Sequence, residues 1–242
     1  MEDIDRWTEL NKMKLNEKKT KNLIFNFTKD HQFSADIRLK NENLEVISKT
    51  KLLGAIITSD LKWHENTKFI VKKANRKMIM LHKFSKFTNN KSHLIHIFKS
   101  QVRGVLEYCS TVWHSSLTNA DSDDIERVQK AAVRLIMGKN YKGYKEALLH
   151  MNLESLRDRR EKMALNFAKK SLKMENFSKL FPINHAIHLM KKRNPEKYVV
   201  TNANTERYRK SAVPFLQRLL NEDYRKQKKD LNRMLQVNND IN

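Results

Sequence analysis

Four basic residues recur at helical spacing between residues 66 and 84. They follow one another at intervals of 4, 4 and 7 residues: Lys68, Lys72, Arg76 and Lys83. A second set, also at helical spacing, is apolar: Ile70, Ala74, Met78 and Leu81. Because residues three or four apart share a helix face, the pattern predicts one helix with a cationic face and an apolar face. Cations on an exposed face can contact phosphate groups, which need charge and reach rather than base-edge geometry.

The positive charge of the chain is concentrated around this helix. The 242 residues include 49 Lys+Arg and 27 Asp+Glu, so the formal net charge is +22. Residues 62–103 contain 11 basic residues and one acidic residue, Glu65. Such a block repels itself unless solvent or a partner screens it, which favours a phosphate-facing surface over a merely solvated one. The expected partner is RNA, DNA or an RNA–DNA duplex, ahead of an acidic membrane surface.

Two pairs of side chains could be imagined as metal ligands. These are His93 with His96 and Cys109 with His114. Neither pair belongs to a four-ligand set of standard spacing, so packing or surface exposure is favoured, and no metal site is predicted. The acidic run Asp121 to Asp124 precedes an amphipathic segment and is better explained as a helix start. The three tryptophans are predicted to anchor a core rather than to stack on bases: Trp7, Trp63 and Trp113.

Composition excludes several classes of protein. The single Cys cannot form an intramolecular disulfide, which favours a reducing compartment, either nucleus or cytoplasm. No apolar run approaches the roughly 20 residues that span a bilayer, and the acidic N-terminus lacks a signal-peptide core, so no membrane association is expected. With 4 Gly and 3 Pro, a β-sandwich or a barrel is disfavoured.

Periodicity predicts an α+β fold that is mostly α. A short helix is expected over residues 3–15. Strands are expected in the N-terminal quarter, at 22–27, 37–39, 44–47 and 51–57, with Gly54 at a bulge or a close backbone approach. Beyond Asp60 the period becomes helical. The expected helices cover residues 66–84, 93–107, 118–137, 144–151, 154–175, 211–221 and 222–236.

Several short strings resemble one family when taken in order. "MKLNEKKTKNLIF" at residues 13–25 follows Trp7, and "LGAIITSDLKW" ends at Trp63. Further on come "KKANR" at 72–76, "VRGVLEYC" at 102–109, "IERVQKAA" at 125–132 and "LESLRDRR" at 153–160. Residues 7–221 thereby resemble the end of the palm, the thumb and the C-terminal extension of non-LTR retrotransposon reverse transcriptases. Two positions depart from the family pattern, Asn66 where His is common and Gly104 where Pro is usual.

The resemblance implies a division of the chain. Residues 1–61 correspond to the end of the palm with a hairpin, and residues 62–138 to a thumb-like helical domain. Residues 139–195 are a helical extension and residues 196–242 a basic C-terminal segment. A small antiparallel hairpin region followed by a helical bundle is the fold that this division implies.

The resemblance also implies roles for individual residues. Lys19, with Lys21 two positions on, matches a lysine near the incoming nucleotide, although from the residues alone a solvated lysine is equally favoured. Leu53 and Gly54 match the tip of the hairpin that grips the primer terminus, with a simple bulge as the equal alternative. The thumb cations along the template–primer duplex are Lys68, Lys72, Arg76 and Lys83.

Catalysis by this chain alone is not expected. The family's chemistry uses magnesium held by paired aspartates, and Asp3 and Asp5 do not lie in the aromatic-x-Asp-Asp setting, so no cofactor and no primer extension are expected. Three functional hypotheses remain open. The chain is a truncated reverse-transcriptase fragment of a mobile element, a domesticated basic nucleic-acid-binding protein, or a helical scaffold whose charge is incidental.

Overall fold

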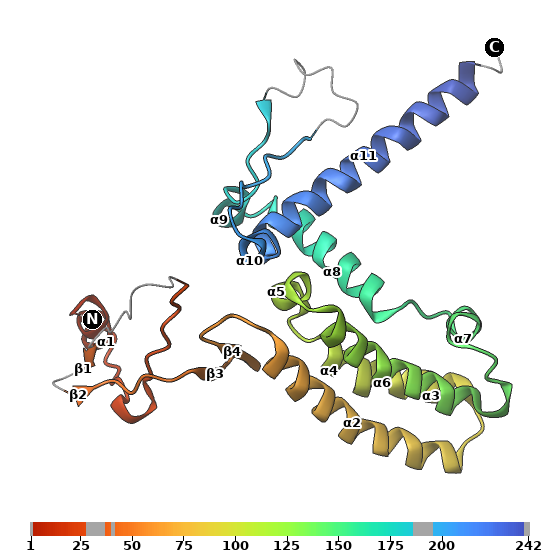
Figure 1. Ribbon diagram of the computed structural model, residues 1–242, viewed down its shortest axis with the longest axis horizontal. Helices are drawn as coiled ribbons and strands as arrows, with labels where there is room; N and C mark the ends of the chain where they lie inside the picture. The colour runs from red at the N-terminus through yellow and green to blue at the C-terminus, as the bar shows by residue number, and fades with distance from the viewer. Residues whose placement is uncertain (1, 28–36, 40–41, 186–195, 240–242) are drawn as a thin grey trace. The chain divides into compact units, whose positions relative to one another are not determined.

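The computed structural model describes residues 2–27, 37–39, 42–185 and 196–239. The chain divides into two compact units, Met1–Phe69 and Ile70–Asn242. The first unit contains short strands and one short helix, and the second is helical (Figure 1). The predicted α+β class, mostly α with small antiparallel sheets near the N-terminus, is therefore confirmed.

The first unit begins with α1 (Glu2–Leu10), which is shorter than the predicted helix 3–15. Its Trp7 side chain is 55% exposed, so the predicted core role is wrong for this tryptophan. The predictions for Trp63 and Trp113 are confirmed, because both side chains are buried. The other apolar residues of α1, Ile4 and Leu10, are also exposed, so within the part of the chain that the structure describes this helix is not covered on its apolar face.

Two very short strands follow, β1 (Arg38–Leu39) and β2 (Glu42–Asn43), paired antiparallel. The predicted strand 22–27 is wrong over the described residues, where Asn22 forms only an isolated parallel bridge with Val46. Phe25 and Phe27 remain exposed, as expected for an alternating segment that lacks a continuous partner strand. The strand predicted at 44–47 is also wrong, since the pairing in this region lies at β2.

The predicted single strand 51–57 is instead a tight hairpin. Strands β3 (Lys49–Leu52) and β4 (Ala55–Thr58) pair antiparallel, with Leu52 opposite Ala55. Leu53 and Gly54 form the two-residue turn, with φ of 46° and 92°. Positive φ at both central residues is what two-residue hairpin turns of type I′ require, and Gly54 adopts it without steric cost. The bulge interpretation of Gly54 is therefore wrong.

Helix α2 (His64–Phe87) begins in the first unit and continues into the second. Next comes a continuous helical stretch. It consists of α3 (Lys91–Ile97), a π-helical segment (Phe98–Arg103) and α4 (Gly104–Glu107). The Asn90 side chain accepts hydrogen bonds from the backbone N–H groups of Ser92 and His93 and so caps α3.

The remaining helices complete the second unit. They are α5 (Ser110–Trp113), α6 (Asn119–Met137), α7 (Tyr144–His150), α8 (Leu156–Ser171), α9 (Glu175–Ser178), α10 (Glu206–Arg209) and α11 (Ala212–Asn239). The two helices predicted at 211–221 and 222–236 form one continuous helix, α11. Pro214 lies in its first turn, where proline needs no backbone donor.

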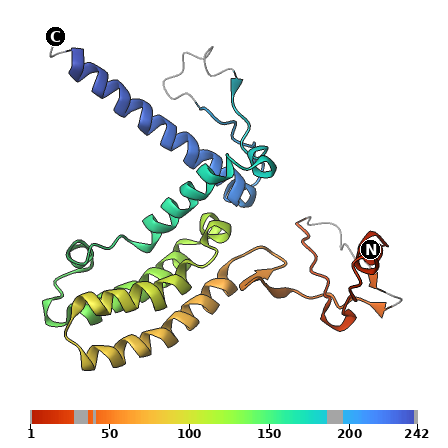
Figure 2. The same cartoon turned by 180° about the vertical axis from the view of Figure 1, so that it is seen from behind.

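The core of the second unit lies where α6 and α8 pack on their neighbours. Helix α6 contacts α3, α7 and α8, and α8 contacts α5 and α11. Seen from behind in Figure 2, α8 again leads from the α7 end of the unit to the start of α11. One apolar cluster joins α8, α11 and the segments between them: Ala164, Ala168, Phe181, Tyr198, Leu216, Leu219 and Leu220. Burial of this apolar surface holds α8 and α11 together.

Candidate nucleic-acid interface

Helix α2 has its predicted basic residues on an exposed face and most of its predicted apolar residues on a buried one, although the apolar Ile79 is 60% exposed. Ile70, Ala74 and Leu81 are buried. On the other face, the four predicted basic side chains are exposed: Lys68, Lys72, Arg76 and Lys83. We call these four residues the α2 stripe. Within the second unit it extends from Lys72 to Lys83, about 16 Å along the helix axis.

Most of the α2 stripe is not neutralised by acidic neighbours. Lys68 Nζ lies 3.4 Å from Glu65 Oε1 in the first turn of the helix. Among the residues that the structure describes, Lys72, Arg76 and Lys83 have no ion-pair partner. Their charge therefore faces solvent uncompensated, and it produces the positive potential that attracts a polyanion.

The hairpin of β3 and β4 is attached to the first turn of α2. Asn66 Oδ1 accepts a hydrogen bond from the Ile56 backbone N–H at 3.0 Å, and the Asn66 residue is only 1% exposed. Lys49 Nζ lies 3.3 Å from Glu65 Oε2, and Lys51 Nζ lies 5.0 Å from the centre of the Phe69 ring. Asn66 thus has a structural role in fixing the hairpin.

The two predicted lysines of the first unit differ in their surroundings. Lys19 is exposed at the end of a short 3-10 turn (Glu17–Lys19), and its backbone N–H donates to Asn16 Oδ1 at 3.1 Å. Lys21 forms an ion pair with Glu45. Of the two, Lys19 is the lysine whose side chain has no ion-pair partner among the described residues. Lys21 contributes less uncompensated charge.

Two arginines of the "LESLRDRR" string turn out to be structural. Arg159 donates from Nε to Glu107 Oε1 at 2.7 Å and from Nη2 to Glu107 Oε2 at 3.2 Å. This bidentate pair joins α8 to α4, 52 residues apart in the chain. Sequence periodicity could not predict this ion pair, because Glu107 and Arg159 are distant in the sequence.

Arg160 is completely buried between α5, α6 and α8. It donates from Nε to His114 Nδ1 at 3.2 Å and from Nη2 to Ser122 Oγ at 3.1 Å. Its guanidinium carbon lies 5.9 Å from the centre of the Trp113 ring. Burial lowers the pKa of Arg160 to about 10, so the group stays charged at neutral pH. Arg160 is therefore a packing residue and is not available to bind phosphate.

The burial of His114 beside Arg160 makes the stability of the fold depend on whether His114 is protonated. Burial, with the nearby charges of Arg160 and Arg157, lowers the pKa of His114 to about 4. In the unfolded chain the His114 imidazole is protonated near pH 6.5, whereas in the folded chain it stays neutral down to about pH 4. The stability that neutral His114 contributes is therefore complete above pH 6.5 and is lost as the pH falls toward 4. We expect the unfolding free energy, measured by urea titration, to fall there by at most about 1.4 kcal/mol per pH unit.

The His114→Asn variant separates this effect from carboxylate titration. An amide oxygen can still accept from Arg160 Nε but does not titrate. The variant should show a shallower decline than the wild type between pH 6.5 and 4. Parallel declines in both proteins would contradict the assignment to His114.

The "IERVQ" string is also part of the helical packing. Glu126 Oε1 accepts hydrogen bonds from the Tyr144 hydroxyl and from the Leu156 backbone N–H. Gln129 Nε2 donates to Tyr144 Oη at 2.8 Å and to the Glu154 carbonyl at 2.9 Å. Burial and the Glu126 contact raise the pKa of Tyr144. These side chains tie α6 to α7 and to the start of α8.

The comparisons with known proteins identify no relative. No protein-family model matches the chain, and neither the search of curated proteins nor the search of solved structures found a match. In the described ranges, no three His, Cys, Asp or Glu side chains are grouped so as to hold a metal ion. Over the same part of the chain, no helix is long and apolar enough to cross a membrane.

Proposed function

We propose that this chain binds duplex nucleic acid, RNA–DNA hybrid above all, through the α2 stripe. The observation that carries the proposal is the exposed row of Lys72, Arg76 and Lys83 without ion-pair partners among the described residues. The ordered strings described above support a source for this surface, the palm end and thumb of a non-LTR retrotransposon reverse transcriptase. In that setting the stripe follows the template–primer duplex.

Binding through such a stripe is independent of base sequence. Lysine and arginine reach phosphate oxygens by charge, and phosphate contacts carry no direct sequence information. Each neutralised phosphate releases counterions, so affinity falls steeply as the salt concentration rises. We assign the described residues no catalytic step.

A filter-binding titration of the purified chain tests the proposal. We expect saturable binding to hybrid duplexes of unrelated sequence, with affinities within about threefold of one another. If each of the four residues of the α2 stripe contacts one phosphate, the affinity should fall roughly 10²-fold between 50 and 200 mM salt. Absence of binding at low salt would contradict the proposal. A strong preference for one sequence would also contradict it.

The hairpin tip provides a separate prediction. Leu53 is 84% exposed at the turn, where the resemblance places a contact with the primer terminus. We expect Leu53→Asn to stabilise the turn, because Asn tolerates positive φ better than Leu. The same change should lower the affinity for a hybrid with a recessed 3′ end by roughly threefold or more, because it removes an exposed leucine side chain, and each buried CH₂ contributes ≈ 0.8 kcal/mol.

A blunt hybrid is the matched ligand for this experiment. The wild type and Leu53→Asn should bind the blunt hybrid with the same affinity. Only the recessed hybrid has a primer 3′ end that is followed by single-stranded template. Equal loss on both ligands, or no loss on either, would contradict a role for Leu53 at the primer terminus.

A further inference from the structure

A concave surface lies between α3, the end of α6 and α7. It is a pocket of about 410 Å³, within the range of small-molecule sites. All of its lining residues belong to the unit Ile70–Asn242. The α2 stripe contributes no side chain to this pocket, so a ligand in the pocket would bind independently of a duplex on the stripe.

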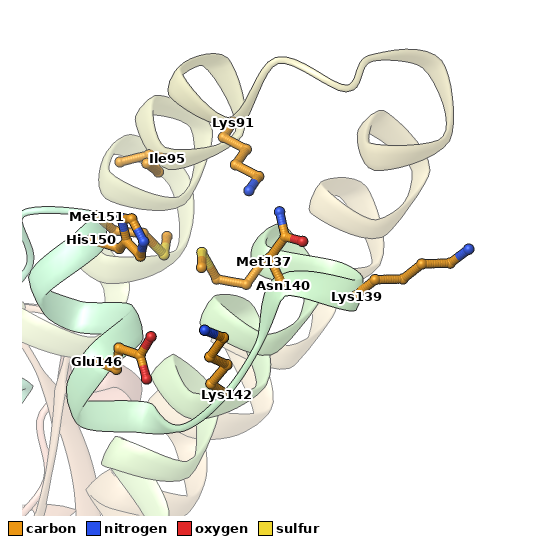
Figure 3. A pocket seen from close by; sticks show the side chains of 9 residues that line it. All are labelled: Lys91, Ile95, Met137, Lys139, Asn140, Lys142, Glu146, His150 and Met151. Atoms are coloured by element: carbon orange, nitrogen blue, oxygen red, sulfur yellow. The ribbon is translucent and has the colours of Figure 1, made fainter.

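The pocket has an apolar floor. Met137 and Met151 are buried, and Ile95 is half-buried beside them. Figure 3 shows the two thioether side chains within the hollow between α6 and α7. Thioethers are polarizable and adapt to flat, weakly polar surfaces, which a nucleobase offers.

The rim of the pocket is cationic. Lys91 and Lys142 direct their ammonium groups toward the hollow, whereas Lys139 points away from it (Figure 3). None of these three lysines has an ion-pair partner in the part of the chain that the structure describes. Glu146 is the one carboxylate in the lining, so the rim remains net positive. An anionic group is the complementary ligand.

We propose that this pocket binds a nucleoside phosphate, with the phosphate between Lys91 and Lys142 and the base on the methionine floor. Inorganic phosphate alone would leave the apolar floor uncovered and is far smaller than the hollow. Asn140, Glu146 and His150 supply hydrogen-bond donors and acceptors for the sugar and the base edge. An acyl chain would leave those polar groups without partners.

Methyl NMR of the full chain with labelled methionines tests the proposal. Titration with adenosine monophosphate should shift the Met137 and Met151 methyl signals to saturation. Adenosine and inorganic phosphate, each lacking half of the ligand, should bind at least about tenfold more weakly. A 5′-phosphorylated trinucleotide distinguishes a strand end from a free nucleotide, and saturable shifts with either ligand support the pocket.

Matched variants complete the experiment. The test variant, Lys91→Gln with Lys142→Gln, should weaken nucleotide binding at least about tenfold. The control variant, Lys145→Gln with Lys162→Gln, removes the same charge outside the lining and should leave the affinity within about twofold of the wild type. Neutralising Lys72, Arg76 and Lys83 should leave the methyl shifts unchanged. The proposal is overturned by absent shifts with both nucleotides, by equal losses in the two lysine pairs, or by loss on neutralising the α2 residues. Unchanged methyl signals of the methionines outside the pocket establish that the free variants fold.

Discussion

Reversing the charge of three α2 residues should lower the affinity for RNA–DNA hybrid by at least about 100-fold at low salt. The variant is Lys72→Glu with Arg76→Glu and Lys83→Glu. All three side chains are exposed and have no ion-pair partner among the described residues, so the change removes phosphate contacts and adds repulsion. The loss should be uniform across unrelated sequences, because phosphates and not bases are contacted. Fluorescence anisotropy with a labelled hybrid measures it.

The control for this variant has the same net charge at other positions. Arg127, Lys162 and Lys169 each already pair with a carboxylate, so they add little uncompensated potential. Changing these three residues to Glu should reduce the affinity by much less than the α2 variant does. Equal losses would show that overall charge governs binding and that α2 forms no specific interface. Circular dichroism of both variants monitors helix content.

Removal of the Glu107 carboxylate should have the largest effect on stability. Glu107 is buried, accepts two hydrogen bonds from Arg159, and lies 3.8 Å from Arg103 Nε. The pKa of Arg103 is lowered by burial and by the charge of Arg159, an effect that Glu107 opposes. Glu107→Ala leaves two guanidinium groups close together without their carboxylate. We expect a loss of about 3 kcal/mol in unfolding free energy and a fall in Tm of roughly 6–12 °C.

Asp124→Ala is the matched control for Glu107→Ala. Asp124 pairs with Arg127 at 2.8 Å, but the Arg127 side chain is largely exposed. An exposed pair contributes about 1 kcal/mol or less. If Glu107→Ala cost no more than Asp124→Ala in thermal or urea unfolding, the buried pair would not be what joins α4 to α8.

Local periodicity was sufficient to predict the features of α2. The alternation of buried Ile70 and Ala74 with exposed Lys72 and Arg76 repeats within one helix, where neighbours three and four residues apart determine the face. The site residues of the stripe could therefore be named from the sequence. Their role with nucleic acid remains a proposal.

The hairpin and the buried ion pair were beyond that kind of prediction. The run "KLLGAII" contains no polar turn residues, and its reversal depends on positive φ at Leu53 as well as at Gly54. The pairing of Glu107 with Arg159 is set by tertiary packing between α4 and α8, which no local pattern encodes. For the same reason Arg160, in a basic string, is buried rather than available to a polyanion.

The salt dependence of binding tests the central claim most directly. For the wild type, a plot of log K against log salt concentration should be linear with a steep negative slope. Lys72→Gln with Arg76→Gln and Lys83→Gln should make that slope shallower by about 2.7, since each lost phosphate contact removes about 0.9. The same slope in both proteins would contradict binding through the α2 stripe.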